Sequence, residues 1–451
     1  MLTAAENETL TRVGPDTQMG RMMRRFWLPI CTSAQLPAPD GDPLRLRLLG
    51  ESFVVFRDTA GRVGILDEFC MHRGVSLALG RVENCGIRCL YHGWQFGVDG
   101  TIMDTPNHHN PKFRARLKAP AFPVLEAGGL VWTYLGDPKR QPPPPRYDFM
   151  TGPDSNRAVI RLNTAANYLQ LYEGGTDSSH VGILHSNSAN PSWMLDQFTP
   201  VEDEDNPGAL AVSDNAPALD IEDTAFGYHY VAKRQGPPEP DGTPTHSIRV
   251  TPVLLPVGRI IPAPAYQFFV FEVPQSDTVT STYIVAHGDR PIERDRILAM
   301  MGLDDPRFWN DRDCDFRADW SNRLGQDRSR LHESWTGFGG IEQEDAVLAV
   351  SMGPIVDRTK EHVVAADRAV LHLRARLLES VRRNDEGLDP IGLDIVDYTR
   401  VRSLPDTTIA VDEAWQSHVP GNADLPGSAD LSGGAEVSGG AEVSGGVAVT
   451  L

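Results

Sequence analysis

The sequence contains no apolar run long enough to span a bilayer, and its first residues, Met1–Glu6, form neither a basic nor an apolar segment. We therefore expect no signal peptide and no membrane association. Positive charge is in deficit, because 42 Lys and Arg face 61 Asp and Glu and leave a formal net charge of -19. Such a charge disfavours nucleic-acid binding. No glycine fingerprint for a nucleotide is present, so a nicotinamide cofactor would have to bind to another protein.

Cysteine is scarce, with five residues in a chain of 451, which excludes a disulfide-rich scaffold. Cys31, Cys85 and Cys314 show no paired spacing, and an odd remainder of this kind is typical of reduced thiols. We therefore expect a cytoplasmic protein. Cys85 lies close in sequence to the other two cysteines, and we interpret it as a free thiol rather than a ligand.

The other two cysteines each lie beside a histidine. The pattern is Cys70-x-His72, sixteen further residues, then Cys89-x-x-His92. Structural zinc sites usually pair like ligands, as in Cys-x-x-Cys. A thiolate and an imidazole in each half instead fit a [2Fe–2S] cluster in which one iron takes two thiolates and the other takes two imidazoles. The spacing predicts a Rieske cluster, which is an electron carrier, and a structural zinc site is the alternative.

Short apolar runs flank these ligands, at 44–49, 52–56, 63–66 and 129–135, and predict strands. A helix is expected over 8–28. Metal-bearing loops between short strands indicate an all-β domain. The proline-rich stretch 138–145 that follows is typical of a stiff spacer and marks a domain boundary.

The second part of the chain predicts an antiparallel sheet covered by helices, which is an α+β arrangement. Long strands are expected over 245–261 and 266–287, the second folded back at 274–277. Helices are expected over 291–303, 313–334 and 357–383. Residues 202–223 carry eight acidic side chains and no Lys or Arg, which predicts a solvated loop. The repeats of Ser-Gly-Gly-Ala-Glu-Val after 432 predict a disordered tail.

A second set of metal-binding residues lies in the stretch 167–185. Glu173, Asp177 and His180 are spaced four and three apart and would share one face of a helix. His180 and His185 are five apart, so they converge only if the chain bends between them, which Gly182 permits. Two histidines and a distant carboxylate form the facial triad of mononuclear non-haem Fe(II) sites. The carboxylates at 342, 344 and 345 are equal candidates by composition.

Taken together, these motifs resemble the oxygenase subunits of Rieske non-haem iron aromatic-ring oxygenases. Within them the chain is most similar to the phthalate 4,5-dioxygenase group, with related O-demethylases and chlorobenzoate dioxygenases. The resemblance covers residues 15–385. It includes the pattern Asn-x-x-Gln-x-x-Glu-x-x-x-Asp-x-x-His-x-x-x-x-His that begins at Asn167, and the segment from Glu344-Asp345 to Asp357-Arg358.

The resemblance implies roles for individual residues. Asp345 becomes the third iron ligand beside His180 and His185. Asp177 is expected to bond His180 and, across a subunit boundary, His92 of a neighbouring copy, which would carry electrons between the metals. This geometry implies a homotrimer or a multiple of it. Electrons would come from an NAD(P)H-dependent reductase with flavin and a [2Fe–2S] centre, and the other reactants would be O2 and a small aromatic molecule.

The expected fold is therefore a two-domain α+β chain. An N-terminal helix over 1–24 packs on the catalytic domain, and the all-β Rieske domain covers 25–138. A proline-rich linker at 139–146 leads to a helix-grip-like catalytic domain with an antiparallel sheet at 147–400. Residues 401–451 form a tail, disordered from about 420.

The reaction expected is hydroxylation, dihydroxylation or O-demethylation, and substrate choice is expected to depend on the sheet. Arg249 lies in a predicted strand and would bind a substrate carboxylate if it points inward, whereas an outward-facing arginine is the alternative. His229, Lys233 and Arg234 are weaker candidates of the same kind. There are two alternative functions. The chain could be an electron carrier without oxygenase activity, or a regulatory or binding protein built on an inactive oxygenase scaffold.

Overall fold

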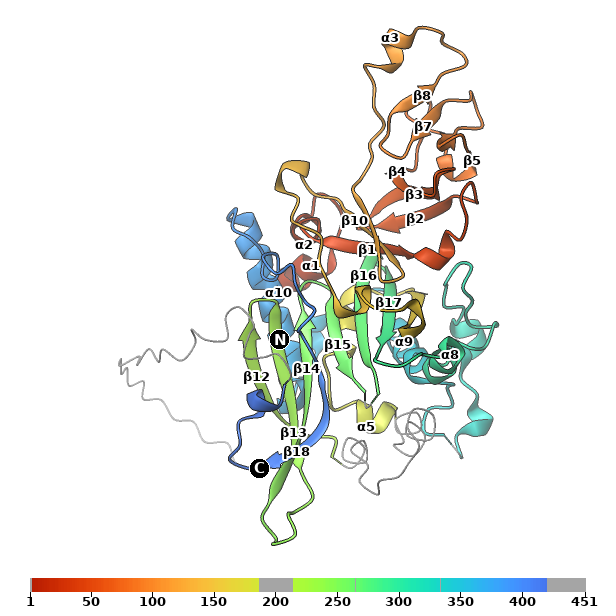
Figure 1. Ribbon diagram of the computed structural model, residues 1–451. Coiled ribbons are helices and arrows are strands. Elements are labelled where there is room, and N and C mark those ends of the chain that lie inside the picture. The colour runs from red at the N-terminus through yellow and green to blue at the C-terminus, as the bar shows by residue number, and fades with distance from the viewer. Residues whose placement is uncertain (1, 186–213, 264, 333, 420–451) are drawn as a thin grey trace.

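The computed structural model describes residues 2–185, 214–263, 265–332 and 334–419. Figure 1 shows a small all-β part, coloured red to orange, standing above a larger part built on one wide sheet. Within the described ranges, no helix has the length and apolar character needed to cross a membrane. The division into a small all-β part and a larger part with one wide sheet and helices confirms the two-domain α+β arrangement expected from the sequence.

The smaller part consists of three short antiparallel sheets. Their strand orders are β1-β10-β9, β2-β3-β4 and β5-β6-β7-β8. Strands β5 to β8 are only three residues long, because each ends at a loop or at a glycine turn. The strands are β1 Trp27–Thr32, β2 Leu44–Leu48, β3 Glu51–Arg57, β4 Val63–Asp67, β5 Arg81–Glu83, β6 Gly86–Arg88, β7 Gln95–Gly97, β8 Ile102–Asp104, β9 Val124–Ala127 and β10 Leu130–Tyr134. A short helix, α3 (Pro111–Arg114), follows β8.

The larger part is an antiparallel sheet of order β11-β17-β16-β15-β14-β13-β12, in which β14 also pairs with β18. Alternating residues of these strands face the core, as in Phe269, Phe271 and Val273. The strands are β11 Arg157–Thr164, β12 Ala218–Thr224, β13 Gly227–Gln235, β14 Thr245–Leu254, β15 Gly258–Pro262, β16 Gln267–Ser276, β17 Val279–His287 and β18 Leu404–Ala410.

Helices cover this sheet. The N-terminal α1 and α2 pack against α10, and α8 and α9 lie beside β11. Amphipathic α10 buries Leu373, Leu377 and Val381 on one side, four residues apart. The helices are α1 Ala4–Thr11, α2 Gln18–Met23, α4 Tyr168–Gly174, α5 Val181–Leu184, α8 Arg294–Met301, α9 Ile341–Ser351 and α10 Arg368–Asp385.

The two parts share one core. Trp132 of β10 packs edge-on against Phe271 of β16, with ring centroids 5.4 Å apart. The turn between β2 and β3 is tied to the end of β16, because the N–H of Leu49 donates to the carbonyl of Pro274 at 2.9 Å. These contacts fix the position of the smaller part, which carries the loops with Cys70 and Cys89, relative to the large sheet.

Three predicted helices differ from the structure. The segment 8–28 is two helices and a strand, because Gly14 and Pro15 interrupt it. The described residues of 313–334, which exclude 333, contain short 3-10 turns at Trp320–Gly325 and Arg328–Arg330 rather than an α-helix. Arg323 and Leu324 have φ of 52° and 54°, a left-handed conformation that an α-helix cannot contain. The helix expected over 357–383 begins only at Arg368, after two 3-10 turns.

The predicted strand 245–261 is a hairpin of β14 and β15, because Pro256 and Gly258 lie at its middle. Part of the acidic segment, Ala218–Thr224, is strand β12 rather than a loop, and residues 202–213 lie outside the described residues. Part of the predicted tail, Leu404–Ala410, pairs with β14 because Ile409 packs on Val231 and Ile248. The tail from 420 also lies outside the described residues.

Candidate metal centres

The two cluster loops have the same backbone construction. In the first, the N–H of Cys70 donates to the carbonyl of the residue after Gly74 at 2.8 Å, and the N–H of Gly74 returns to the Cys70 carbonyl at 2.8 Å. In the second, the N–H of Cys89 donates to the carbonyl of Trp94 at 2.8 Å, and the N–H of Gly93 donates to the Cys89 carbonyl at 3.0 Å. Gly74 and Gly93 have φ of 71° and 75°, which favours glycine. Each Cys-x-His or Cys-x-x-His motif is thus part of a loop closed by backbone hydrogen bonds.

The four ligand side chains gather between these loops. Cys70 and Cys89 are each 3% exposed, and burial raises the pKa of the Cys70 thiol to about 11, so a thiolate there needs a bound cation. The rings of His72 and His92 lie 4.5 Å apart, edge to face. Nδ1 of His92 is buried and has no hydrogen-bond partner, which suits a metal ligand.

The spread of these four residues fits two metal ions better than one. Zinc, with bonds of about 2.0–2.3 Å, would hold its four ligand atoms about 3.3–3.8 Å apart. No three of these four residues have ligand atoms that all lie within 4.8 Å of one another. Among the described residues, the group that meets this distance lies in the larger part of the chain. The residues present therefore fit a [2Fe–2S] cluster with two thiolates on one iron and two imidazoles on the other.

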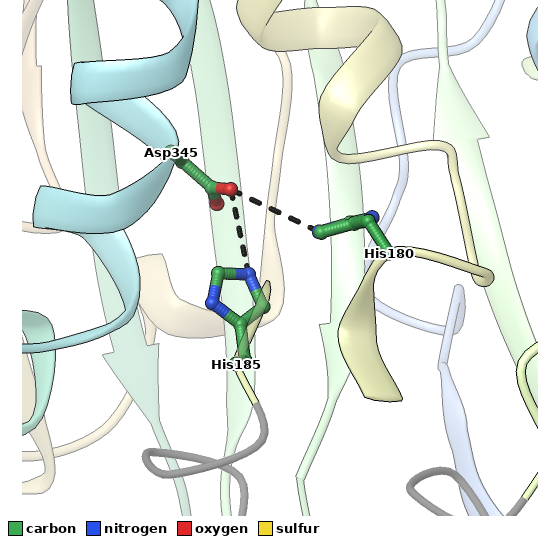
Figure 2. Close-up of side chains that lie close together, drawn as sticks. All are labelled: His180, His185 and Asp345. Carbon is green, nitrogen blue, oxygen red and sulfur yellow. Dashed lines mark ion pairs between the residues drawn. The ribbon is translucent and has the colours of Figure 1, made fainter. Parts of the chain in front are cut away.

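That compact group is His180, His185 and Asp345 (Figure 2). Oδ1 of Asp345 lies 3.8 Å from Nε2 of His180 and 3.4 Å from Nε2 of His185. The two imidazole centroids are 5.0 Å apart. Three ligand atoms that converge from one side leave the other side open, and two histidines with one carboxylate are the ligand set of non-haem Fe(II) oxygenases. The group fits a mononuclear iron.

The histidines reach the site from the two ends of a single helical turn. His180 immediately precedes α5 and His185 immediately follows it, where its ψ of 17° takes the backbone off the helical path. Gly182 lies inside the turn, so the convergence does not need the bend expected there. Glu173, Asp177 and His180 do not share a helix face either, because α4 ends at Gly174.

Asp345 lies on α9 just after its first turn, and its neighbours Glu342 and Glu344 in that turn have other contacts. Oε2 of Glu344 bonds Nδ1 of His185 at 2.7 Å, and its other oxygen accepts from Thr336. A carboxylate on Nδ1 sets the ring's orientation and leaves Nε2 for the metal. Glu342 is buried without such a partner, and burial next to Glu272 and Asp345 raises its pKa well above the usual range.

The electrostatics of the triad call for a cation. Burial would lower the pKa of His185, but Asp345 and Glu344 outweigh it and raise the pKa to about 10. Burial raises the pKa of Asp345, but the two histidines outweigh it, so its pKa is lowered and it stays ionised. Two carboxylates, Glu344 and Asp345, therefore lie against His185, and Asp345 also faces His180, an arrangement that a divalent metal neutralises.

Asp177 lies in the turn that leads from α4 to α5. Its Oδ2 is 3.4 Å from Nδ1 of His180, and its Oδ1 accepts from the N–H of Ser179 at 2.7 Å. The side chain is 22% exposed, so it is accessible from outside this chain. Asp177 thus lies beside the His180 nitrogen that faces away from Asp345.

Two polar residues of α4, Gln170 and Glu173, connect this helix to α9, to α10 and to the segment that follows α9. The Gln170 amide donates to the carbonyls of Ala349 and Gly353 at 2.8 and 3.0 Å, and its oxygen accepts from the Val356 N–H at 3.1 Å. Glu173 accepts from two buried arginines, Arg358 and Arg374. The sequence placed Gln170 in a motif and Glu173 beside Asp177 and His180, but predicted none of these contacts, although polar side chains three apart in an otherwise apolar helix are a signal of them.

Replacing Gln170 by alanine is expected to lower the free energy of unfolding by about 2–4 kcal/mol, because three buried or partly buried backbone groups lose their partner. The mononuclear iron should also be lost faster to a chelator, since α4 and α9 are no longer clamped. Urea denaturation and timed iron quantitation measure the two effects. Exposed Gln18→Ala, which loses two surface hydrogen bonds, to Thr9 and Asp385, is the control. Equal stability and equal iron retention in both variants would contradict this role.

A cavity of about 140 Å³ opens directly onto the triad. Its wall is mainly apolar, and Arg249 of β14 and Arg259 of β15 provide positive charge. Arg249 therefore faces inward, and Arg259 is paired with buried Glu272 at 2.8 Å. Lys233 pairs with Asp220, and His229 packs against Phe226 and Trp415, so neither lines the cavity. The apolar wall is formed by Val181, Ile261, Pro262, Ala263, Phe268, Val270, Ile284, Met300, Met301 and Ile341.

Comparison with known proteins accounts for both halves of the chain. Residues 26–123 match the Rieske [2Fe-2S] domain, and residues 133–422 match the family described as LigXa C-terminal domain like. The chain is 35% identical to the phthalate 4,5-dioxygenase oxygenase subunit of Pseudomonas putida, over 87% of this chain and 89% of that protein. It is 32% identical to the 3-chlorobenzoate-3,4-dioxygenase oxygenase subunit of Comamonas testosteroni, over 93% and 99% respectively.

Solved structures show the same fold at lower identity. NdmA of Pseudomonas putida CBB5 aligns with a TM-score of 0.54 and 18% identity, over 88% of this chain and all of that one. Dicamba monooxygenase bound to dicamba aligns with a TM-score of 0.52 and 17% identity, over 81% and 98%. With the sequence matches, the cluster loops and the His/His/Asp site, these likenesses lead to one conclusion. The chain belongs to the oxygenase subunits of the Rieske non-haem iron oxygenases, in the phthalate 4,5-dioxygenase-like group.

Proposed function

We propose that this enzyme uses O2 and electrons from an NAD(P)H-dependent reductase to hydroxylate, dihydroxylate or O-demethylate a one-ring aromatic carboxylate. The observation that carries this proposal is the apolar cavity between the His180/His185/Asp345 triad and Arg249. Related subunits are named for phthalate, 3-chlorobenzoate and, as an O-demethylase, 5,5'-dehydrodivanillate. The triad and this cavity also argue against the alternative of a simple electron carrier.

The size of the cavity supports a single aromatic ring. An apolar cavity of about 150 Å³ in another protein holds benzene, and this one has about 140 Å³ with an apolar wall. Burial of the ring would drive binding, and polar groups at the cavity's ends would set its orientation. The substrate carbon to be oxidised would then face the open side of the triad.

Arg249 supports recognition of one carboxylate. Its guanidinium donates to the Pro262 carbonyl at 3.2 Å, and Arg234, on the neighbouring strand, reaches the Ser178 carbonyl at 3.4 Å. Asp406 of β18 lies near both arginines, whose charges oppose the rise in its pKa that burial causes. Two cations and one anion leave a single positive charge, which suits a monocarboxylate.

Replacing Arg249 by methionine is therefore expected to raise KM for an aromatic carboxylate about 10- to 100-fold, which corresponds to about 1.5–3 kcal/mol for charged hydrogen bonds. KM for an uncharged aromatic ring should change little, because the apolar wall is intact. Steady-state oxygen uptake gives both values. Lys233→Met, which removes a cation of the neighbouring strand outside the cavity, is the control. A similar KM in Arg249→Met and wild type would contradict the carboxylate contact.

In the working enzyme, the mononuclear iron supplies the site of reductive O2 activation and the cluster supplies the electrons. The protein's part is structural and electrostatic. His180, His185 and Asp345 hold one face of the metal, Glu344 holds the His185 ring, and the cavity excludes water around the substrate. We infer that Asp177, beside His180, accepts a hydrogen bond from an imidazole of another subunit, which its 22% exposure supports.

The assembly that we infer is a homotrimer or a multiple of it, in which the cluster of one chain serves the triad of the next. Two observations support this. Within one chain the cluster-bearing strands and α5 lie at opposite ends (Figure 1). The tips of the cluster loops are apolar and exposed, with Met71, Leu90 and Tyr91 at 39%, 60% and 53%. An exposed apolar rim of this kind fits a subunit interface. A cytoplasmic location and the domain boundaries given above remain predictions.

Metal analysis and oxygen uptake test the proposal together. The oxygenase should contain three irons per chain, whereas an electron carrier would contain two. Uptake of O2 with NADH and a reductase, screened over benzoates, phthalates and methoxybenzoates, should rise with a carboxylate substrate and give an oxygenated product. No product from any aromatic carboxylate, with three irons present, would refute the substrate assignment.

A further inference from the structure

Charge is distributed very unevenly along this acidic chain. Residues 69–123, which include the cluster loops and α3, contain seven Lys and Arg and three Asp and Glu, a net charge of +4. Because the whole chain carries -19, the remaining residues carry -23. A basic segment on an otherwise acidic protein creates a local positive field, which attracts acidic partners and repels the protein's own surface.

Most of the unpaired positive charge of this segment lies at or just after α3, and Arg73 of the first cluster loop, which lies over the Tyr91 ring, is a further exposed cation. The three acidic side chains of the segment are engaged, since Glu83 pairs with Arg88 at 2.8 Å, and Asp104 and Asp99 also have basic partners. Lys112 and Arg116 are exposed and form no ion pair within the described part of the chain. In Figure 1, α3 is at the outer tip of the cluster domain, away from the large sheet.

The same region is hollowed. A surface depression of about 470 Å³ is formed by β8 and the segment around α3, with Arg114, Arg116 and Lys118 on its wall. It also exposes the apolar side chain of Met103, at 39%. A basic, partly apolar hollow matches the composition of a transient protein interface better than that of a small-molecule site.

Packed rings connect this surface to the cluster. His108 contacts Phe113 with ring centroids 4.5 Å apart, Phe113 lies edge-on to Trp94 at 5.9 Å, and Trp94 stacks on the cluster ligand His72 at 4.7 Å. Trp94 is held in place by a hydrogen bond from its indole N–H to Asn107 at 2.8 Å. An electron donor at α3 would therefore be separated from the cluster by closely packed side chains rather than by solvent.

We propose that α3 and β8 form the docking surface for the electron donor, an acidic iron–sulfur electron-transfer domain of the reductase. The apolar tips of the cluster loops, at Met71 and Leu90, are a separate surface and are left for the neighbouring subunit. With a cluster held by Cys70, His72, Cys89 and His92, the α3 surface would be the side from which electrons arrive, and His92 would face the neighbouring subunit. Charge complementarity sets the rate of this encounter and its dependence on salt.

Stopped-flow reduction of the cluster tests the surface without any substrate. The probe is reduced plant-type [2Fe–2S] ferredoxin, an acidic protein, and the variant is Lys112→Glu/Arg116→Glu. At low ionic strength its second-order rate constant should fall about tenfold or more, and at about 0.5 M salt it should converge with wild type. Reduction by methyl viologen radical cation should not slow in the variant, which shows that the cluster is intact.

Lys139→Glu/Arg312→Glu is the matched control, because it changes the charge equally at exposed positions outside this surface. The proposal is overturned if this control slows reduction as much as the α3 variant, or if the α3 variant reacts at the wild-type rate at low salt. It is also overturned if the α3 variant dissociates the oligomer in size-exclusion chromatography, since the surface would then belong to a second copy of this chain.

Discussion

Replacing Asp345 by alanine is expected to remove the mononuclear iron and to abolish turnover, while the visible and EPR spectra of the cluster stay unchanged. Asp345 is the carboxylate whose oxygen lies within 3.8 Å of both histidine Nε2 atoms. Two imidazoles alone bind Fe(II) weakly, and removal of even an outer partner costs about 10- to 100-fold in metal affinity. Iron per chain should therefore fall from three to two, and product formation should fall below about 1% of wild type.

Its neighbours on α9 provide the controls. Glu342→Gln keeps the size of a buried side chain and removes an acid that the geometry places outside the ligand set, so three irons should remain. Glu344→Ala removes the acceptor at Nδ1 of His185, and the iron should bind about 10- to 100-fold more weakly without being lost outright. If Glu342→Gln lost the iron and Asp345→Ala kept it, the choice of carboxylate would be wrong.

Asp177→Asn is expected to lower turnover about 100-fold or more with all three irons present. Asparagine has the shape of aspartate, but it lacks the negative charge that holds Nδ1 of His180 and accepts from an imidazole of the next subunit. The loss should appear in the rate at which a reduced cluster is reoxidised in the presence of substrate and O2. Cluster reduction by ferredoxin should stay normal, because it occurs before this step.

Mixed oligomers test whether this transfer crosses a subunit boundary. Cys89→Ala removes the cluster from one chain and Asp177→Asn blocks delivery in another, so each homo-oligomer should be inactive. When the two variants are unfolded and refolded together, an intact cluster can lie beside an intact Asp177 in a neighbouring chain, and part of the activity should return. Activity that never exceeds the sum of the separate variants would place the electron path within one chain.

The same arrangement explains why the cluster domain has two different surfaces. Its loop tips are apolar, and its outer end at α3 is basic. An apolar surface suits a permanent contact, whereas a charged surface suits a partner that must arrive, deliver one electron and leave. The cluster would then have separate places for electron entry and electron exit.

The sequence by itself predicted the candidate cluster site and the candidate pair of histidines. Cys70 and His72, Cys89 and His92, and His180 and His185 are each separated by at most five residues, so chain connectivity alone keeps each pair close together. Glycines at 74 and 93 mark the turns that close the loops. Alternating apolar residues in β16 and β17 likewise predicted paired strands, because that pattern depends only on neighbours along the chain.

Only the tertiary structure decided which carboxylate completes the triad and that Arg249 faces the cavity. Glu342, Glu344 and Asp345 are chemically alike and adjacent, and the direction of each depends on the rotation of α9 about its axis, which Gln170 and the packing of α4 fix. Arg249 has the same local sequence whether it faces inward or outward. Its side is set by register with β13 and β18, and β18 lies more than 150 residues further along the chain. Such choices follow from contacts between distant segments, and these arise only when the chain has folded.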